Sequence, residues 1–280
     1  MTRTEPSGPA LLERAGELAL VAAAVERAAA GRGGTLLVEG PAGIGKTRLL
    51  DAARSAAAGG GFRVLAARGS PLEREFGFGV VRGLLEPAAR TAMPGADEGA
   101  ARLAARVLDP DGTTATPSFA ALHGVYWLVV ALAEQGPLLL AVDDGHWADG
   151  PSLRVLHHLA RRIDHLPVLI ALATRPHEPD ADTELLEALR DEPGSTVLRP
   201  APLSADGTVA VLRRVLGDGV QPAFADACHE VAGGNPLLLT ALVGSLHQAG
   251  VAPVAAGVDA VRERAPAIVS AFVLPRLRHL

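Results

Sequence analysis

A glycine-rich turn at residues 40–47, Gly-Pro-Ala-Gly-Ile-Gly-Lys-Thr, constrains the fold more than any other stretch of the chain. The apolar run 35–39 before it predicts a short strand, and apolar residues at helical spacing after it predict a helix. Glycines let the backbone wrap closely around a phosphate, so that backbone N–H groups and the positive end of the helix face the anion. The pattern is therefore a P-loop in the setting that this motif requires. A glycine turn that precedes a helix by chance is the alternative.

Two side chains of the turn suit nucleotide chemistry. Lys46 would reach the β- and γ-phosphates, and the Thr47 hydroxyl would hold Mg²⁺, so the predicted cofactors are ATP and Mg²⁺. Lys46 is the only lysine among the 26 lysines and arginines, as expected where a compact ammonium is needed in place of a planar guanidinium. The candidate nucleotide-binding residues of this stretch are Gly40, Pro41, Ala42, Gly43, Ile44, Gly45, Lys46, Thr47 and Arg48.

Two adjacent carboxylates supply the second half of the candidate site. The apolar run 138–142 predicts a strand buried in a parallel sheet, and Asp143 and Asp144 follow it. Because open α/β sheets bind ligands at the carboxyl ends of strands, we expect Asp143 to hold Mg²⁺ and Asp144 to orient or deprotonate the attacking water. We expect this pair and Lys46 to come from neighbouring strand ends. An acidic pair in a turn is the alternative, and the short reach of Asp predicts slow hydrolysis.

Arg175 follows the next apolar run, residues 168–173. If that strand lies beside the strand of the P-loop, Arg175 points at the γ-phosphate, where a guanidinium can distinguish ATP from ADP. A solvated arginine at a strand end is the alternative. The candidate catalytic residues are thus Lys46, Asp144 and Arg175.

The residues after the acidic pair predict structural roles. Asp149 precedes Gly-Pro-Ser, which predicts that a helix starts here. We expect the Trp147 side chain to serve as a packing anchor. Contact with phosphate is an alternative role for His146, but no partner for a catalytic triad or metal site is evident. The Gly-Phe-Gly at 77–79 is not a dinucleotide fingerprint, because the third glycine is misplaced and no strand precedes it.

Composition limits the partners. The net charge of −5 gives no basic footprint for nucleic acid. Cys228 is the only cysteine, which excludes a disulfide within the chain and a cysteine-based zinc site. We therefore expect a cytoplasmic protein, and, since no apolar run is long enough to span a bilayer, no membrane partner.

The order of the predicted elements indicates an α/β fold with a smaller helical region. Five apolar runs predict strands that alternate with helices, which indicates a P-loop NTPase with a central, mainly parallel five-stranded sheet. These runs are 35–39, 62–67, 138–142, 168–173 and 196–199. After residue 202 the pattern is helical. The predicted domains are an N-terminal segment and helix (1–33), a core (34–202) with a helical insertion (71–133), a helical lid domain (203–255) and the truncated start of a further domain (256–280). The N-terminal helix is expected over residues 11–30, and breaks in the helical insertion are expected near 93–95 and 109–112.

These motifs resemble the nucleotide-binding part of the STAND class of P-loop ATPases, and more narrowly the large ATP-binding LuxR-type transcriptional regulators of actinobacteria. The P-loop is generic, whereas the combination of Asp-Asp-x-His-Trp-Ala-Asp with Gly-Asn-Pro is specific. Besides the P-loop, the matching stretches are Leu-Glu-Arg-Ala-Gly-Glu-Leu at 12–18, Pro-Leu-Glu-Arg-Glu-Phe-Gly-Phe-Gly-Val-Val at 71–81, Val-Asp-Asp-Gly-His-Trp-Ala-Asp at 142–149, Ala-Thr-Arg at 173–175 and Gly-Gly-Asn-Pro-Leu-Leu at 233–238.

The resemblance implies an AAA-like ATPase domain that works as a switch, in which ATP and Mg²⁺ bridge the core and the helical domain. It implies that the ATP-bound form self-associates and activates transcription, with DNA bound only through a helix-turn-helix domain absent from this chain. It also implies that Pro236 packs on the nucleotide and that Arg14 lies near the adenine pocket. A proline at a helix start and a surface arginine are the alternatives. Glu13 stands where the family usually has glycine.

Three questions stay open at this point. An AAA-type motor with steady turnover would need a trans-acting arginine, for which Arg161 and Arg162 are candidates. A P-loop kinase of small molecules would need an arginine-rich lid, and the stretch 203–250 offers only Arg213 and Arg214. The uncapped amphipathic pattern at 261–280 predicts a chain that stops inside a folded element, with a frayed terminus as the alternative.

Overall fold

The computed structural model describes residues 11–92, 118–176, 178–179 and 181–277. The described chain forms two compact units. The first unit contains Ala15–Pro41 and Lys46–Arg199, and the second contains residues 11–14, Ala42–Gly45 and residues 200–277. The glycine-rich turn is therefore divided, because its apex groups with the second unit.

The first unit is built on a parallel sheet of five strands, as the sequence predicts. The strand order is β2-β3-β4-β1-β5. The strands are β1 (Gly34–Glu39), β2 (Arg63–Arg68), β3 (Leu138–Asp143), β4 (Val168–Thr174) and β5 (Ser195–Leu198). Every bound lies within one residue of the predicted run. Strands β3 and β4 are buried almost throughout, which explains why their sequences are continuous apolar runs.

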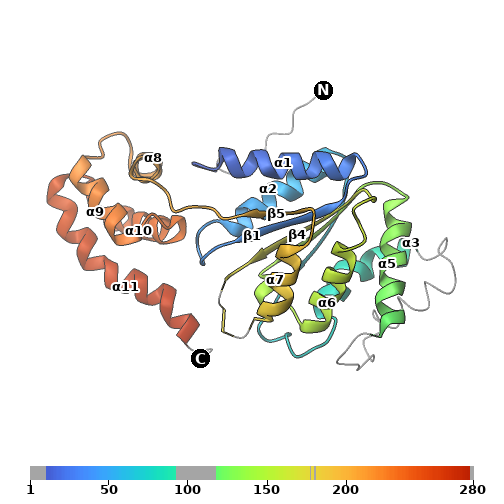
Figure 1. Cartoon of the computed structure of the whole chain (residues 1–280). Helices are drawn as coiled ribbons and strands as arrows, with labels where there is room; N and C mark the ends of the chain where they lie inside the picture. The colour runs from blue at the N-terminus through green and yellow to red at the C-terminus, as the bar shows by residue number, and fades with distance from the viewer. Residues whose placement is uncertain (1–10, 93–117, 177, 180, 278–280) are drawn as a thin grey trace. The chain divides into compact units, whose positions relative to one another are not determined.

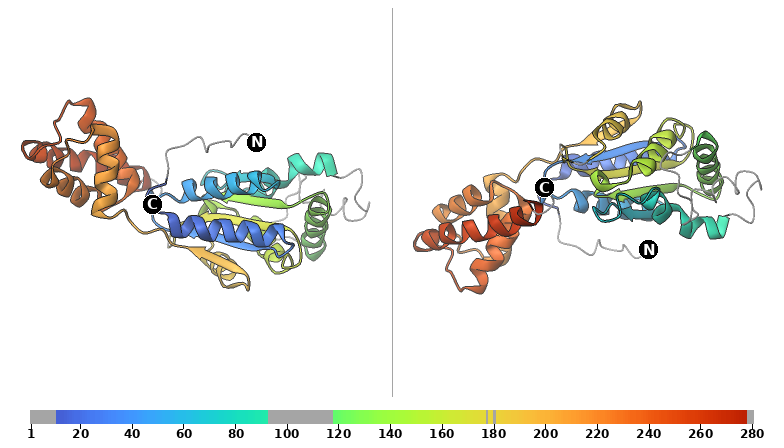
Figure 2. Two further views of the ribbon diagram at one scale, coloured as in Figure 1. Left: turned by 90° about the horizontal axis from the view of Figure 1, so that it is seen from above. Right: turned by 90° about the horizontal axis from the view of Figure 1, so that it is seen from below.

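Helices cover both faces of this sheet (Figure 1). Helices α1 (Ala15–Ala29) and α2 (Lys46–Gly59) pack on one face. The opposite face packs into the main hydrophobic core with α3 (Gly79–Ala92), α6 (Gly150–Ala160) and α7 (Thr183–Asp191). The views in Figure 2 place α5 (Phe119–Ala133, green) at one end of this unit, where it packs on α3 and α6.

The start of α1 differs from the prediction, and part of the predicted helical insertion lies outside the described residues. A helix was expected from residue 11, but α1 begins at Ala15. The reason is that Glu13 adopts a left-handed backbone conformation, with φ of 54°, which an α-helix does not tolerate. In the predicted helical insertion, α3 and α5 are present, whereas the breaks expected near 93–95 and 109–112 lie outside the described residues.

The second unit is helical, as the sequence predicts after residue 202. Its helices are α8 (Ala205–Leu216), α9 (Pro222–Ala232), α10 (Pro236–Gln248) and α11 (Val258–Leu277), with a short 3₁₀ turn at Ala255–Gly257. They enclose a separate apolar core that includes Phe224, Leu242 and Cys228. Burial raises the pKa of the Cys228 thiol to about 12, so this cysteine behaves as a small core residue. Among the described helices, none combines the length and apolarity needed to cross a membrane.

Candidate functional site

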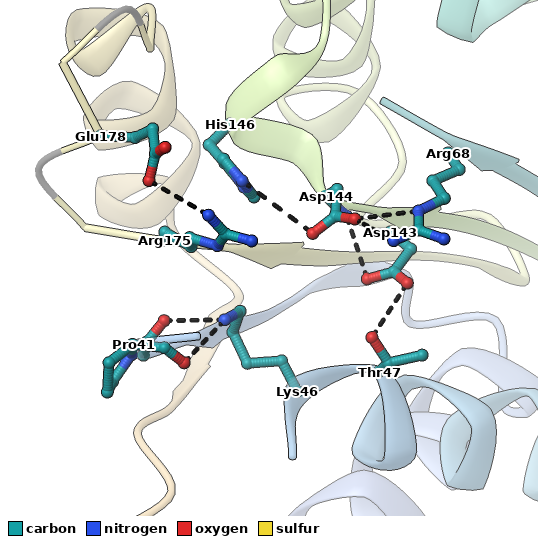
Figure 3. Close-up of polar contacts among 10 residues, drawn as sticks. Pro41, Lys46, Thr47, Arg68, Asp143, Asp144, His146, Arg175 and Glu178 are labelled. Atoms are coloured by element: carbon teal, nitrogen blue, oxygen red, sulfur yellow. Dashed lines mark hydrogen bonds and ion pairs between the residues drawn. The ribbon is translucent and has the colours of Figure 1, made fainter. Parts of the chain in front are cut away.

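The P-loop turn runs from the end of β1 to the first residue of α2. Gly43 and Gly45 have φ values of 79° and 106°, which only glycine adopts readily, so the turn needs glycine at these positions. The Lys46 ammonium donates hydrogen bonds to the carbonyls of Gly40 (2.8 Å) and Pro41 (2.9 Å), as Figure 3 shows. Lys46 is only 7% exposed. A buried ammonium is therefore held at the mouth of the turn by the loop's own backbone.

Thr47, in the first turn of α2, meets Asp143, the last residue of β3. The Thr47 hydroxyl donates a hydrogen bond of 3.0 Å to Oδ2 of Asp143 (Figure 3). The expectation that Lys46 and the Asp143–Asp144 pair come from neighbouring strand ends is wrong, because β4 lies between β1 and β3. Thr47 and Asp143 still meet because α2, which begins at Lys46, packs across β3 and β4. The helix start thus carries Thr47 over the intervening strand.

The Thr47–Asp143 pair fits a magnesium ion. A hydroxyl and a carboxylate are hard oxygen ligands, and Mg²⁺ is commonly held by one or two protein oxygens with water and substrate phosphates completing its shell. Among the described residues, no group of three histidines, cysteines or carboxylates could form an all-protein metal site. The donor set therefore suits a metal that arrives with a phosphate ligand.

Asp144 is engaged by a residue that the sequence analysis missed. Its Oδ2 accepts hydrogen bonds from Nε (2.9 Å) and Nη2 (2.6 Å) of Arg68, the last residue of β2. This pairing raises the pKa of the Arg68 guanidinium. Gly69 lets the backbone after β2 lie close to the backbone of Asp144, because a Cβ at this position would lie 2.3 Å from the Asp144 carbonyl oxygen. The rule of strand ends that selected Asp143 and Arg175 would also have found Arg68, which directly follows a predicted strand.

Arg175 follows β4, which lies beside β1 in the order that its predicted role requires. Its side chain is 17% exposed, so it is not the solvated arginine of the alternative. Nη1 lies 3.5 Å from Oε2 of Glu178, and the guanidinium carbon lies 5.0 Å from the ring centroid of Trp147. Nε is buried without a hydrogen-bond partner in the described chain. Trp147, predicted as a packing anchor, therefore supports a cation beside the acidic pair.

His146 is fully buried beside Trp147, with ring centroids 4.7 Å apart. Its Nε2 lies 3.9 Å from Oδ1 of Asp144, too far for a hydrogen bond (Figure 3). Burial, together with the charge of Arg175, lowers the pKa of this imidazole to about 3, so it is neutral at pH 7. No hydrogen-bond partner for either ring nitrogen is found among the described residues.

Two further strand-end residues were missed by the sequence analysis. Thr174 ends β4, and its buried hydroxyl has no hydrogen-bond partner in the described part of the chain, while its carbonyl accepts from the Gly40 amide (3.3 Å). Glu39 ends β1 and is 8% exposed. Its Oε2 accepts from Nε (3.1 Å) and Nη2 (3.0 Å) of Arg199. Glu39 directly precedes the P-loop, and Thr174 ends the strand beside β1. Their positions at strand ends could have identified both residues from the sequence.

In the second unit, the start of α10 holds the apex of the P-loop. Pro236 is the first residue of this helix and Asn235 is its cap, so Pro236 has the geometry of the helix-start alternative. Asn235 Nδ2 donates to the Ala42 carbonyl (2.9 Å), and the Leu237 amide donates to the Gly43 carbonyl (3.2 Å). The Gly-Asn-Pro motif therefore fixes two carbonyls of the phosphate-binding turn.

Arg14 also contacts the apex of the turn. It donates to the carbonyls of Ala201 (2.6 Å) and Ile44 (3.5 Å) and is 4% exposed, so the surface-arginine alternative is wrong. The proposed contacts of Arg14 and Pro236 with a nucleotide remain predictions. Arg48 lies on the exposed side of the first turn of α2.

The arginines named for other functions take part in none of the contacts given above. Arg161 is the C-cap of α6 and its Nε lies 3.6 Å from Oε1 of Glu192, while Arg162 donates to the carbonyl of His158. Arg213 and Arg214 occupy the last turn of α8.

Comparisons with known proteins identify the family and the fold. The family model described as "AAA ATPase domain" matches residues 10–171, more than half of the chain. An uncharacterised protein of Rhizobium meliloti (strain 1021) is 27% identical over 267 residues, which cover 83% of this chain. The chain spans only 24% of the length of that relative.

Solved structures with the same fold include a Walker-type ATPase and a protein solved with bound nucleotides. A Walker-type ATPase of Pyrococcus abyssi has a TM-score of 0.61 and 15% identity, covering 96% of this chain and 75% of its own. The Aeropyrum pernix ORC2 protein, solved as ADPNP–ADP complexes, has a TM-score of 0.55 and 18% identity, covering 92% of this chain and 69% of its own. At these identities the likeness establishes the P-loop NTPase fold.

Proposed function

Because the chain belongs to the AAA ATPase domain family, we propose that it binds ATP with Mg²⁺ and works as a switch that hydrolyses ATP slowly. The observation that carries the proposal is the 3.0 Å hydrogen bond between Thr47 and Asp143. It brings the two predicted magnesium ligands together next to Lys46, although Thr47 lies in the helix after β1 and Asp143 ends β3, a strand that does not neighbour β1. A chance glycine turn and a chance acidic pair would have no reason to meet.

Each residue has a distinct part in this proposal. Lys46 exchanges the carbonyls of Gly40 and Pro41 for oxygens of the β- and γ-phosphates. Thr47 and Asp143 hold Mg²⁺, which neutralises phosphate charge when bound. In hydrolysis, the oxygen of water bonds to the γ-phosphorus while the bond from that phosphorus to the β–γ bridging oxygen breaks. The electron pair leaves with ADP, and Asp144 accepts a proton of the water.

Slow turnover is supported by the environment of Asp144. The Arg68 guanidinium binds its carboxylate at 2.6 Å, and this ion pair must open before Asp144 can accept a proton of the water. The side chain of Asp is also shorter than that of Glu, which limits its reach to a water. A switch uses hydrolysis only to end its active state, so slow hydrolysis is sufficient for this function.

We further assign the switch to a transcriptional regulator, on the resemblance of the stretches 142–149 and 233–238 to LuxR-type regulators. In this assignment residues 203–255 of the second unit form the lid domain, and the contacts of Asn235 and Arg14 with the P-loop apex report the nucleotide state. The ATP-bound form self-associates, and DNA is bound through a helix-turn-helix domain outside this chain.

The test compares nucleotide states of the same protein. Analytical ultracentrifugation with Mg²⁺ and a non-hydrolysable ATP analogue should show self-association, whereas ADP should leave the protein less associated. Steady-state turnover should be well below the rate of roughly 1 per second found at the low end for enzymes. Equal sedimentation in both states would contradict the switch, and rapid, sustained turnover would indicate a motor of the AAA type instead.

A further inference from the structure

His146 is the least satisfied polar side chain of the site. It is 0% exposed, and neither ring nitrogen has a hydrogen-bond partner in the described chain. A buried polar group without a partner costs free energy, and such groups are rare in folded proteins. A hydrogen-bond partner for this ring must therefore come from outside the described side chains or from a rearrangement of them.

The nearest acceptor is the carboxylate of Asp144. Both hydrogen bonds from Arg68 go to Oδ2, so Oδ1 is the oxygen that faces the imidazole. Nε2 of His146 lies 3.9 Å from this Oδ1. A shift of about 1 Å would bring the two atoms within hydrogen-bond distance. Figure 3 shows the imidazole directed at Asp144 from the turn that follows β3.

The surroundings fix both the position and the charge of this ring. Trp147 packs against it at 4.7 Å between centroids and also carries Arg175 at 5.0 Å. Burial and the charges of Arg175, Lys46 and Arg68 disfavour the imidazolium and outweigh the opposite effect of Asp144. The ring is therefore a neutral donor. A neutral donor can orient a carboxylate without cancelling its charge, which a guanidinium does.

Arg68 is placed to leave. Its side chain is 71% exposed, whereas the side chain of Asp144 is 10% exposed. A triphosphate offers a guanidinium several anionic oxygens, so it competes strongly with one carboxylate for Arg68. Departure of Arg68 would leave Asp144 without its present partner, beside a donor that also lacks one.

We propose that His146 is the positioning residue for Asp144: when a triphosphate draws Arg68 away, Nε2–H of His146 binds Oδ1 and holds the carboxylate toward the attacking water. The inference rests on the proposed function, since it concerns the hydrolytic step. In the structure described above, Asp144 is in the state bound to Arg68, and exchange of Arg68 for His146 converts an inhibited base into an oriented one.

The test replaces His146 by residues that keep or remove the donor. His146→Gln retains an N–H near the position of Nε2, whereas His146→Leu fills the site without a donor. We expect His146→Leu to lower kcat by about tenfold or more, because lost general-base function costs roughly 10²–10⁴-fold and this residue only orients the base. His146→Gln should recover most of the loss. The affinity for ATP and Mg²⁺ should change less than about twofold, because His146 is proposed to act on the base.

His158 provides a matched control. It is also buried, its Nε2 also lacks a partner in the described chain, and it lies on α6. His158→Leu should leave kcat unchanged. Equal losses of kcat in His146→Leu and His158→Leu would indicate a general packing effect and overturn the inference.

A spectroscopic reading separates orientation from packing. The chain has two tryptophans, so Trp127→Phe leaves Trp147, which touches the His146 ring, as the reporter. Addition of Mg²⁺ and a non-hydrolysable ATP analogue should change the Trp147 emission in this background and in its His146→Gln derivative. The change should be smaller in the His146→Leu derivative.

The outcomes distinguish the inference from the function beneath it. A wild-type protein that does not bind ATP would overturn the proposed function and this inference together. A wild-type protein that hydrolyses ATP, with kcat unchanged in His146→Leu or equally reduced in His146→Gln and His146→Leu, would overturn the inference alone.

Discussion

Asp149 illustrates how one buried side chain orders two segments of the chain. It caps α6, as predicted: Oδ1 accepts from the Ser152 amide and Oδ2 from the Ser152 hydroxyl, both at 2.7 Å. The same carboxylate accepts from the amides of Phe78 (2.7 Å) and Val80 (3.3 Å), at the start of α3. Asp149 is 2% exposed. The motif stretch 142–149 therefore combines site residues at its beginning with a structural anchor at its end.

Removal of this anchor should destabilise the fold. Asp149→Ala leaves several buried N–H groups without an acceptor, and we expect the free energy of unfolding to fall by about 2–4 kcal/mol, as each unsatisfied buried group costs roughly 1–3 kcal/mol. Urea denaturation measures the loss. The control is Asp182→Ala, which removes an α7 cap with one amide hydrogen bond of 3.3 Å and should cost about 1 kcal/mol. Equal losses in the two variants would show that the contacts with α3 contribute nothing.

At the scale of elements, prediction succeeded where burial alone decides the pattern. Strands β3 and β4 are buried on both faces, and a continuous apolar run marks such a strand directly. The start of α1 was wrong because a tertiary contact overrides helix propensity: the Glu13 carboxylate accepts from the Ser204 amide at 2.8 Å. The hydrophobic pattern does not give the order of strands in the sheet. The position of β4 between β1 and β3 and the pairing of Arg68 with Asp144 were therefore not predicted.

At the start of α10, one substitution can separate the two hydrogen-bonding roles of Asn235. The Oδ1 of Asn235 caps the helix by accepting from the amides of Leu237 and Leu238, while its Nδ2 donates to the Ala42 carbonyl. Asn235→Asp keeps the cap but removes the donor. We expect the ATP affinity to fall by about tenfold, a loss of roughly 1.4 kcal/mol in binding, with the free energy of unfolding changed by less than about 1 kcal/mol.

Isothermal titration calorimetry and urea denaturation measure these two effects. Asn235→Ala is the control, because it loses the cap as well and should reduce both quantities. An unchanged ATP affinity in Asn235→Asp would show that the bond to Ala42 does not support the phosphate-binding turn.

At the scale of the whole molecule, the division of the P-loop was not predictable. The sequence places residues 40–47 in one motif, but the apex Ala42–Gly45 groups with the second unit. Within the described residues, the chain leaves the first unit for the second after Pro41 and after Arg199. Within the first unit, Glu39 and Arg199 hydrogen-bond at these two exits. A local pattern reveals a phosphate-binding turn but not which distant backbone groups hold it.

The stability of the molecule should depend on pH through its buried histidines. Burial lowers the pKa of His146 to about 3 and that of His158 to about 4. In the unfolded chain both would titrate near 6.5, so below that pH the unfolded state binds more protons. The free energy of unfolding should therefore fall as the pH is lowered from about 6.5 toward 3, and these residues should contribute no slope above about 7.5.

Urea denaturation between pH 7.5 and 4.5 tests this dependence. His158→Leu removes one of the two groups, so its stability should decline less steeply than that of the wild type. An identical slope in the two proteins would contradict the buried, neutral state of His158.

Calorimetry of the wild-type protein and Lys46→Ala decides whether the P-loop binds ATP. We expect Mg²⁺-dependent ATP binding by the wild-type protein. Lys46→Ala should lose affinity by at least about tenfold, because a hydrogen bond to a charged group contributes roughly 1.5–3 kcal/mol. Undiminished ATP affinity in Lys46→Ala would show that Lys46 does not bind the phosphates and that the proposed nucleotide site is wrong.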